Sequence, residues 1–426
     1  MIPAVDEILR FNRAFSHLGG KADALLASPL AFFRGTFHLF ARDLADGSFD
    51  NFPFARARGP IVADLHTENF GAFRAVTNEI VYDVNDFDET TRGPYEFDLR
   101  RLATSLFLAA EENGHSFADG MAAAEAMLGE YLEALAALSR FKTRRQFAQA
   151  VSPEVARLIA RAGERSRVVF MQRVVASDAR RGFLIQLDSR KATGQKRFAP
   201  ITETERRAIE KAVPAFLKTV MAPTGADPTR YSLFDAAFRF AGVGSIGRQR
   251  YALLFGKKPA TDATFKDLRL IEWKEARPSA INPFAKSTPP GRAREVFEAT
   301  RTFQLFPKRY LGCATLDHEP MQTREVGAND ARFDAATFTD PRSFQAASRA
   351  FGHITARVHL LGAEESPGPR RLLTEIRGNE ARFTRRVLAF AAAYSDRTWR
   401  AHNELLRRRD EVRSAWHQVS NRRSPA

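Results

Sequence analysis

Two short acidic segments contain the residue types that phosphate chemistry with a divalent cation requires. The first covers residues 64–69 and the second covers residues 85–89. A carboxylate can accept or orient a proton, and a carboxamide offers a neutral oxygen to a cation. Carboxylates at strand ends bind Mg²⁺ in enzymes that transfer phosphate groups. The two segments therefore indicate a metal-assisted site with one catalytic carboxylate, Asp64, and three metal ligands, Asn69, Asp86 and Asp88.

Each segment also has a plainer interpretation, as an acidic turn whose Asp side chains cap a helix. For either segment alone this interpretation is favoured, because short motifs often match by chance. The two segments lie close together in the chain, however, and each follows a strand-like apolar stretch, 60–63 and 79–84. Their pairing favours one shared site over two unrelated turns. His66 is expected to hydrogen-bond within its loop rather than to act as a base.

A glycine-rich segment, 242–247, lies much later in the chain and has the spacing G-x-G-x-x-G. In dinucleotide-binding folds this spacing opens a helix, but here residues 248–255 have the pattern of a strand. A glycine loop between two strands is typical of the hairpin that covers phosphates in kinase-like enzymes. A bulged hairpin without a ligand is an equally good interpretation of the segment alone. The expected nucleotide-binding residues are Gly242, Gly244, Ser245 and Gly247.

Lys274 lies at the end of an apolar stretch that predicts a strand after the glycine loop. Kinase-like enzymes use a strand lysine to hold the α- and β-phosphates, and a glutamate on a nearby helix supports it. The predicted helix 292–306 offers Glu295 and Glu298, and Glu298 is the preferred partner. Considered alone, Lys274 would be an ordinary solvated lysine, so its interpretation depends on the glycine loop before it.

The composition is that of a globular protein with an excess of basic residues. Lys and Arg number 65 against 50 Asp and Glu, and the formal net charge of +15 attracts polyanions. Because the basic residues are spread along the chain, nucleic-acid binding ranks lowest among the interpretations. The single cysteine, Cys313, excludes an internal disulfide and gives no support for zinc. The sequence predicts neither a signal peptide nor a membrane span, so we expect a cytoplasmic protein without a membrane partner.

The rest of the chain predicts helices around strand-rich regions. Helical spacing is found in residues 97–106, 121–138 and 351–361. A turn cluster at 223–228 predicts a boundary, after which strand patterns occur at 238–241, 251–255 and 268–274. Ser28 directly before Pro29 predicts the start of another helix.

These residues, in this order, resemble the bacterial domain-of-unknown-function 2252 family, which is placed among the protein-kinase-like folds. The resemblance covers most of the chain, except the helical middle and the extreme C-terminus. The matching segments are 28–35, 64–71, 85–90, 93–103, 242–247 and 274–279.

The acidic segments are also similar to those of aminoglycoside-phosphotransferase-type kinases, whose catalytic loop is Asp-x-His-x-x-Asn. That resemblance implies a catalytic aspartate, a metal-binding asparagine, a metal-binding aspartate and a structural helix aspartate, in the order Asp64, Asn69, Asp86 and Asp98. Two positions depart from the pattern. Ala63 replaces the usual glycine before the catalytic aspartate, and Val62 stands where many kinases have histidine.

The order of the motifs differs from that of ordinary kinases, in which the glycine loop and lysine precede the catalytic loop. Here they follow it, which predicts a circular permutation. The resemblance therefore implies an α+β, two-lobed, protein-kinase-like fold with a large helical C-lobe and a small antiparallel-sheet N-lobe. We expect 1–225 to form the first part of the C-lobe, 226–335 the N-lobe, and 336–426 the return to the C-lobe.

Together these features predict an ATP- and Mg²⁺-dependent phosphotransferase that acts on a hydroxyl-bearing acceptor, either a small molecule or a protein. Three other interpretations stay open. The same fold could transfer AMP or another nucleotidyl group, or it could bind nucleotide without turnover, as a pseudokinase. The basic C-terminal helices could bind nucleic acid, with an affinity that falls steeply as salt increases.

Overall fold

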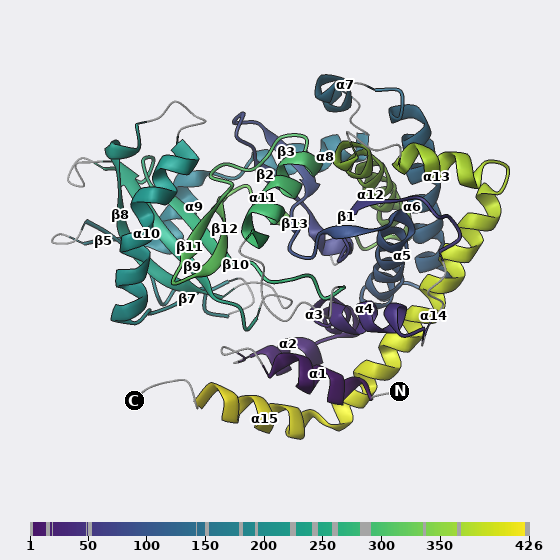
Figure 1. Ribbon diagram of the computed structural model, residues 1–426, viewed down its shortest axis with the longest axis horizontal. Helices are drawn as coiled ribbons and strands as arrows, with labels where there is room; N and C mark the ends of the chain where they lie inside the picture. The colour runs from purple at the N-terminus through teal and green to yellow at the C-terminus, as the bar shows by residue number, and fades with distance from the viewer. Residues whose placement is uncertain are drawn as a thin grey trace.

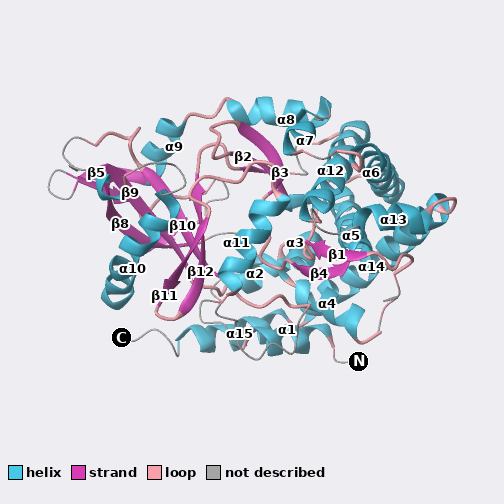
Figure 2. Ribbon diagram, turned by 45° about the horizontal axis from the view of Figure 1, so that its top comes forward, coloured by secondary structure: helices cyan, strands magenta, loops and turns pink. Residues whose placement is uncertain are grey.

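The computed structural model combines a helical body with a six-stranded antiparallel sheet (Figure 1). The structure describes residues 3–13, 18, 20–47, 49, 53–141, 143–149, 153–178, 182–191, 195–221, 227–240, 246–257, 263–281, 291–334, 338–363 and 368–421. The sheet lies at one end of the molecule and the long helices lie at the other (Figures 1 and 2). The predicted α+β class with small antiparallel sheets is confirmed.

The helical body is built around α6 (Phe117–Leu138) and α12 (Pro341–Gly362), which pack side by side although they are far apart in the sequence. Gly352 of α12 lies at the crossing, where a Cβ atom would collide with the backbone carbonyl oxygen of Met127 in α6. The buried helix α5 (Tyr95–Glu112) packs against α6. The other helices of the body are α3 (Pro29–Gly35), α4 (Phe37–Ala45), α7 (Arg144–Gln149), α8 (Pro153–Gly163), α13 (Gly368–Ile376) and α14 (Glu380–Arg407).

The predicted start of a helix at Ser28 is confirmed, because its hydroxyl oxygen accepts a hydrogen bond of 3.1 Å from the backbone N–H of Ala31. The predicted helices 97–106, 121–138 and 351–361 fall within α5, α6 and α12. The apolar spacing of these segments is explained by one continuous hydrophobic core, to which all three contribute.

The six strands of the large sheet are antiparallel throughout, in the spatial order β11-β12-β10-β9-β8-β7. Their bounds are β7 (Phe198–Ala199), β8 (Tyr231–Arg239), β9 (Arg250–Lys257), β10 (Arg269–Glu275), β11 (Gly312–Leu316) and β12 (Glu319–Val326). Helix α11 (Arg292–Phe303) connects β10 to β11, and the short 3-10 helix Pro228–Arg230 precedes β8.

The two faces of this sheet have different neighbours. Trp273 of β10 packs against Phe216 of α10 (Glu203–Met221), with 5.1 Å between the ring centroids. Because side chains alternate along a strand, the adjacent Lys274 points to the opposite face. That face is turned toward the acidic segment that contains Asp86 and Asp88.

The boundary expected at residue 225 lies outside the described residues and stays a prediction. The segment before it contains α9 (Arg167–Val174), the hairpin β5 (Val175–Asp178) and β6 (Gly182–Ile185), and α10, all of which share cores with the large sheet. The helical spacing of this segment does not show what its apolar stripe packs against. In the structure, α10 buries that stripe on the strands of the large sheet rather than on other helices.

Two small sheets carry the acidic segments. In the first, β1 (Arg58–Ile61) pairs with β4 (Thr91–Pro94) and leads into Asp64. In the second, β2 (Phe70–Arg74) lies between β13 (Ala331–Arg332) and β3 (Ile80–Val84), which leads into residue 85. Because β2 pairs with β3, the end of the first acidic segment, at Asn69, lies beside the start of the second, at Asn85.

Helices from both ends of the chain form a third layer (Figure 1). They are α1 (Ala4–Asn12), α2 (Lys21–Leu26) and α15 (Arg409–Asn421), which share a small apolar core with α14. None of the helices in the described ranges is both long enough and apolar enough to span a membrane.

Gly352 gives a stability test with a matched control. We expect Gly352→Ala to destabilise the protein by about 2 kcal/mol, because the added methyl group forces α6 and α12 apart. Gly129 lies within α6 with open space around its Cβ position, so Gly129→Ala should stabilise the protein by about 0.5–1 kcal/mol. Urea unfolding measures both changes, and a destabilising effect of equal size in both variants would contradict the account.

Candidate active site

Asp64 follows β1 in a turn that begins with an unusual backbone conformation. Ala63 has a φ of 71°, in the left-handed region that favours glycine. The alanine thus keeps the conformation that the glycine of the kinase pattern would adopt freely.

One face of α5 holds this turn in place. The two carboxylate oxygens of Asp98 accept hydrogen bonds from the backbone N–H groups of Val62, at 2.8 Å, and Ala63, at 2.7 Å. His359 of α12 also contacts Asp98, with 3.1 Å between Nε2 and Oδ2. Asp98 is fully buried, so these partners replace the water that the carboxylate loses. The helix aspartate therefore fixes the backbone on which Asp64 stands.

The next turns of the same helix face fix the rest of the loop. Arg101 donates from Nε to Asp64 at 2.5 Å, and its Nη2 donates to the carbonyl oxygen of Phe33 at 3.0 Å. The hydroxyl oxygen of Ser105 accepts a hydrogen bond of 3.1 Å from the backbone N–H of Thr67. Asp98, Arg101 and Ser105 are spaced by three and four residues, as one face of a helix requires.

The side chain of Asp64 remains 21% exposed despite this support. Burial raises the pKa of Asp64 to about 7, against the opposing effect of Arg101, and the negative charges of Glu89 and Asp86 add to the rise. The carboxyl group can therefore gain or lose a proton near neutral pH, which suits a general base.

Asn69 closes the loop and connects it to the second acidic segment. Its side-chain oxygen accepts a hydrogen bond of 2.9 Å from the backbone N–H of His66. Its backbone carbonyl accepts one of 2.9 Å from the N–H of Asn85, at the start of the second segment. The first contact leaves one lone pair of the carboxamide oxygen, so Asn69 can still bind a cation.

The second acidic segment meets the large sheet through Lys274. The Nζ atom of Lys274 lies 3.7 Å from Oδ1 of Asp86 and forms a closer ion pair with Asp88. Asp88 also accepts hydrogen bonds from Arg248, at 3.0 Å, and from Gln322. Asp86 keeps 26% of its side chain exposed, whereas Asp88 is surrounded by donors. Asp86 is therefore the carboxylate of this pair that is open to a ligand.

Arg248 is a site residue that the sequence analysis missed. Its Nη2 donates to Glu89 at 2.9 Å, while its Nη1 binds Asp88, so one guanidinium bridges two adjacent carboxylates. The other oxygen of Glu89 accepts a hydrogen bond of 2.7 Å from the backbone N–H of Ala280. The available signal was position, because Arg248 directly follows the glycine-rich segment at Gly247.

The structure does not pair Glu298 with Lys274. Among the described residues, the ion-pair partners of Glu298 are Arg294 and Arg301, at 3.9 and 3.8 Å on the outer face of α11. Lys274 is 1% exposed and takes its counter-charges from Asp86 and Asp88. Burial lowers the pKa of Lys274 to about 8, while the two carboxylates act in the opposite direction. The glutamate was chosen from helical position alone, which did not show which face of α11 meets the sheet.

The glycine-rich segment is described only at its end. Gly242, Gly244 and Ser245 lie outside the described residues, so their predicted contacts with phosphate stay predictions. Gly247 has a φ of 103°, a conformation that side-chain-bearing residues rarely adopt. The carbonyl oxygen of Ile246 lies 3.3 Å from Nζ of Lys21 in α2, so this end of the segment reaches the terminal helical layer.

A small cavity of about 40 Å³ adjoins Asp64. Its charged lining consists of Lys21, Arg34, Asp64, Glu89 and Arg248. Arg34 forms an ion pair of 2.5 Å with Glu68 of the first acidic segment, which gives this residue a role that the sequence did not reveal. Burial lowers the pKa of Lys21 to about 7. The charged part of the wall beside Asp64 is therefore mostly basic.

Within the described ranges no group of three or more His, Cys, Asp or Glu side chains is arranged to hold a metal ion. The reason lies in the partners of the acidic segment, because Asp88 and Glu89 face Lys274 and Arg248. For Asp88, predicted as a metal ligand, both carboxylate oxygens contact side-chain donors.

A family search matches residues 13–408 to the family described as "Uncharacterized protein conserved in bacteria (DUF2252)". The chain belongs to this family. The resemblance drawn from the acidic, glycine-rich and lysine segments is thereby confirmed at the level of the family. Searches of curated proteins and of solved structures found no match.

The ion pairs of Asp88 predict a pH dependence of stability in this DUF2252 protein. Burial acts to raise the pKa of Asp88, but Lys274 and Arg248 outweigh it and hold the pKa well below its usual range. A lowered folded-state pKa stabilises the protein above the unfolded-state pKa, near 3.8, and this stabilisation is lost as pH falls through the folded-state value. We expect Asp88→Asn to lose about 3 kcal/mol at pH 7, and to lose stability less steeply than wild type between pH 5 and pH 3.

Urea unfolding at several pH values measures both quantities. Asp410→Asn is the control, because its side chain is 84% exposed and its change should stay within about 0.5 kcal/mol. Parallel pH curves for wild type and Asp88→Asn would show that the ion pairs do not set this dependence.

Proposed function

We propose that this protein is a phosphotransferase of the kinase-like class, which transfers a phosphoryl group from ATP with Mg²⁺ to a hydroxyl-bearing acceptor. The observation that carries the proposal is the meeting of Lys274 with Asp86, at 3.7 Å. The two residues come from motifs that are far apart in the sequence, and the proposal requires them to share one site. A catalytic carboxylate, Asp64, lies close enough to Asp86 for its pKa to respond to that charge.

The order of elements in the sheet supports a kinase-like arrangement. The glycine-rich segment joins β8 to β9, Lys274 stands on the next strand, β10, and α11 follows. Protein kinases have the same succession of glycine loop, strand lysine and helix. Because this succession comes after the acidic segments, the kinase-like proposal includes a circular permutation of the chain.

Asp86 and Asn69 are the residues that would hold Mg²⁺. Mg²⁺ in such sites needs only one or two protein oxygens, because phosphates and water complete its coordination. Asp86 offers a partly exposed carboxylate. Asn69, whose backbone carbonyl accepts a hydrogen bond from the N–H of Asn85, offers a carboxamide oxygen. These donors fit a Mg²⁺ ion, which when bound would neutralise charge on the phosphates.

The protein's own residues would divide the work as follows. The carboxylate of Asp64 would accept the proton of the acceptor hydroxyl as its oxygen attacks the γ-phosphorus, while the bond from that phosphorus to ADP breaks. Arg101 would hold Asp64 in position. Lys274 would bind phosphate oxygens, which would compete with Asp86 and Asp88 for its ammonium group.

Replacement of Asp86 tests the proposal directly. We expect Asp86→Ala to reduce Mg²⁺-dependent release of phosphate from γ-labelled ATP, with water as acceptor, by about a thousandfold or more. Its thermal midpoint should stay close to that of wild type, because the side chain is partly exposed. Asp396→Ala, whose side chain is 60% exposed on α14, is the control and should keep full turnover.

Unchanged turnover in Asp86→Ala would count against the assignment. Transfer of label from α-labelled ATP instead of γ-labelled ATP would replace the proposal with nucleotidyl transfer. Nucleotide-dependent thermal stabilisation without turnover in wild type would identify a nucleotide-binding pseudokinase.

The raised pKa of Asp64 predicts how the rate changes with pH. A general base acts as the carboxylate, which predominates above a pKa of about 7. The rate of phosphate release should therefore rise about tenfold per pH unit below neutrality and level off above pH 8. A rate profile measured from pH 5.5 to 9 tests this, and a flat profile over that range would rule out Asp64 as the base.

A further inference from the structure

A second cavity lies between the large sheet and the β13-β2-β3 sheet. Glu272, which stands two residues before Lys274 on β10, is part of its lining. It has a volume of about 300 Å³, at the lower end of the range for small-molecule sites. Its basic lining residues are Lys191, Arg197, Arg239, Lys308, Arg324 and Arg332. Only Glu272 and Asp330 supply acidic side chains to the lining, so positive charge is in clear excess.

The excess persists after the ion pairs are assigned. Lys308 pairs with Asp330 at 2.6 Å. Glu272 is shared by three guanidinium groups, those of Arg239, Arg250 and Arg324. One carboxylate cannot neutralise three cations, and like charges held together in a partly buried space repel one another.

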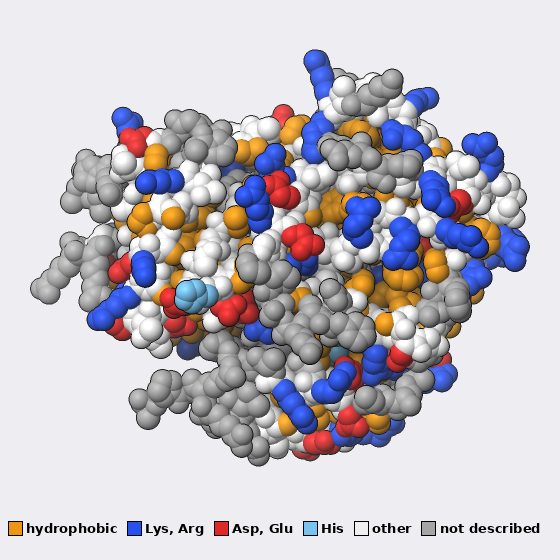
Figure 3. Space-filling view, in the orientation of Figure 1, with side chains coloured by type: hydrophobic (Ala, Val, Ile, Leu, Met, Phe, Trp, Pro, Cys, Tyr) orange, Lys and Arg blue, Asp and Glu red, His pale blue; other side chains and the backbone are white. Residues whose placement is uncertain are grey.

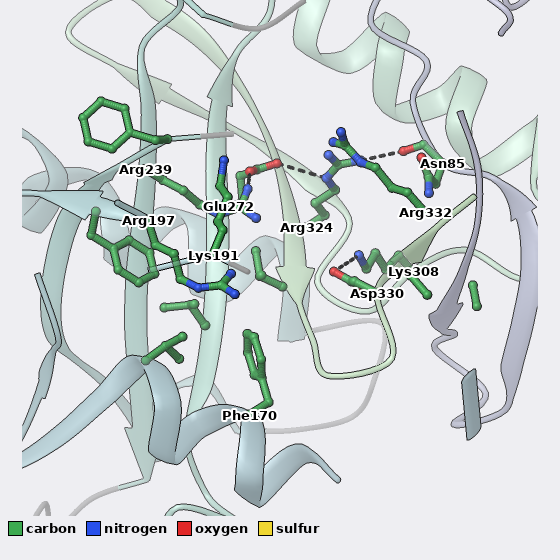
Figure 4. A pocket seen from close by; sticks show the side chains of 17 residues that line it. Asn85, Phe170, Lys191, Arg197, Arg239, Glu272, Lys308, Arg324, Asp330 and Arg332 are labelled. Carbon is green, nitrogen blue, oxygen red and sulfur yellow. Dashed lines mark hydrogen bonds and ion pairs between the residues drawn. The ribbon is translucent and has the colours of Figure 1, made fainter. Parts of the chain in front are cut away.

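The far wall adds cations that no carboxylate of the described residues pairs with. Arg197 donates from Nε to the carbonyl oxygen of Arg190 at 3.0 Å, and Lys191 contacts the side-chain oxygen of Gln195 at 2.8 Å. Burial and the nearby charge of Arg239 lower the pKa of Lys191 to about 8. Figure 4 shows these side chains converging on the same space as Glu272 and Arg324.

The shape and chemistry of the cavity identify its ligand class. Guanidinium groups bind phosphate oxygens in pairs of parallel hydrogen bonds, and several of them together suit a chain of phosphates. The wall also contains Phe170, Phe198 and Phe240, on which an organic group of the ligand could pack beside the cations. On the face visible in Figure 3, by contrast, Lys and Arg are interspersed with acidic and apolar side chains.

We propose that this cavity binds the phosphate chain of a small polyphosphorylated ligand, through Lys191, Arg197, Arg239, Arg324 and Arg332. The cavity adjoins the second acidic segment, because Asn85 is part of its lining and its carbonyl oxygen accepts a hydrogen bond of 2.6 Å from Arg324. The proposal does not depend on the transfer reaction proposed above. The ligand is either a nucleotide or an inorganic polyphosphate, which share the chemistry that these residues recognise.

Binding of sodium tripolyphosphate without Mg²⁺ tests the site. Titration calorimetry should give saturable binding to wild type at constant ionic strength, and the Kd should rise about tenfold or more in the double variant Lys191→Gln/Arg197→Gln. The charge-matched control is Arg207→Gln/Arg230→Gln, whose side chains are 76% and 80% exposed, and it should bind as wild type does.

Absence of binding in wild type would overturn the proposal. Equal binding in wild type and in Lys191→Gln/Arg197→Gln would overturn it as well. If the double variant does not fold, Arg332→Gln, at an exposed position on the opposite wall, provides the same test with a weaker expected effect of about threefold.

Competition by ATP and by adenosine distinguishes the two sources of phosphate. Displacement of tripolyphosphate by ATP, with an affinity for ATP that falls in Lys191→Gln/Arg197→Gln, identifies a nucleotide ligand. An ATP affinity that the double variant leaves unchanged, together with weakened tripolyphosphate binding, identifies an inorganic chain. Displacement by adenosine as strong as that by ATP would contradict a phosphate site.

Discussion

The organisation of the site depends on one electrostatic constraint, the neutralisation of the acidic segment that follows β3. Its carboxylates stand on a backbone held by the helical body, whereas the cations that face them, Lys274 and Arg248, belong to the large sheet. Buried carboxylates without counter-charges would cost several kcal/mol each, so the two parts of the protein stabilise each other across this contact. The same ion pairs leave Asp86 as the more open carboxylate, which makes it the position where a ligand can enter the network.

The helical body fixes the position of the loop around Asp64. Asp98, Arg101 and Ser105 of α5 each bind the loop around Asp64, and β2–β3 pairing sets Asn69 beside Asn85. These contacts act on backbone groups of a turn that contains a left-handed alanine, a conformation that persists only where the surroundings enforce it. A base whose position is fixed in this way can act on an acceptor without first being ordered, which is the general advantage of preorganised sites.

Two cavities adjoin the residues around the Lys274 contact. The smaller one lies beside Asp64 and is bounded by Lys21 and Arg34, and the larger one collects basic residues around Glu272. Both cavities have mostly basic charged linings, so part of the positive charge of the chain is concentrated at these two cavities. Anionic groups are therefore the common chemistry expected of ligands on either side.

The sequence alone was enough to predict the elements that present the candidate site residues. Strands end where the acidic segments begin, Lys274 stands on a strand, and helical spacing found α5, α6 and α12, because these features rest on local patterns of one chain segment. Only the tertiary structure decided the partners. Glu298 pairs with Arg294 rather than with Lys274, whereas Arg248 pairs with Asp88. Helix α10 packs on the large sheet rather than on the helical body. Each outcome depends on which faces meet across long sequence separations. The basic cavity was equally hidden, since its basic residues are spread from Lys191 to Arg332 and share no motif.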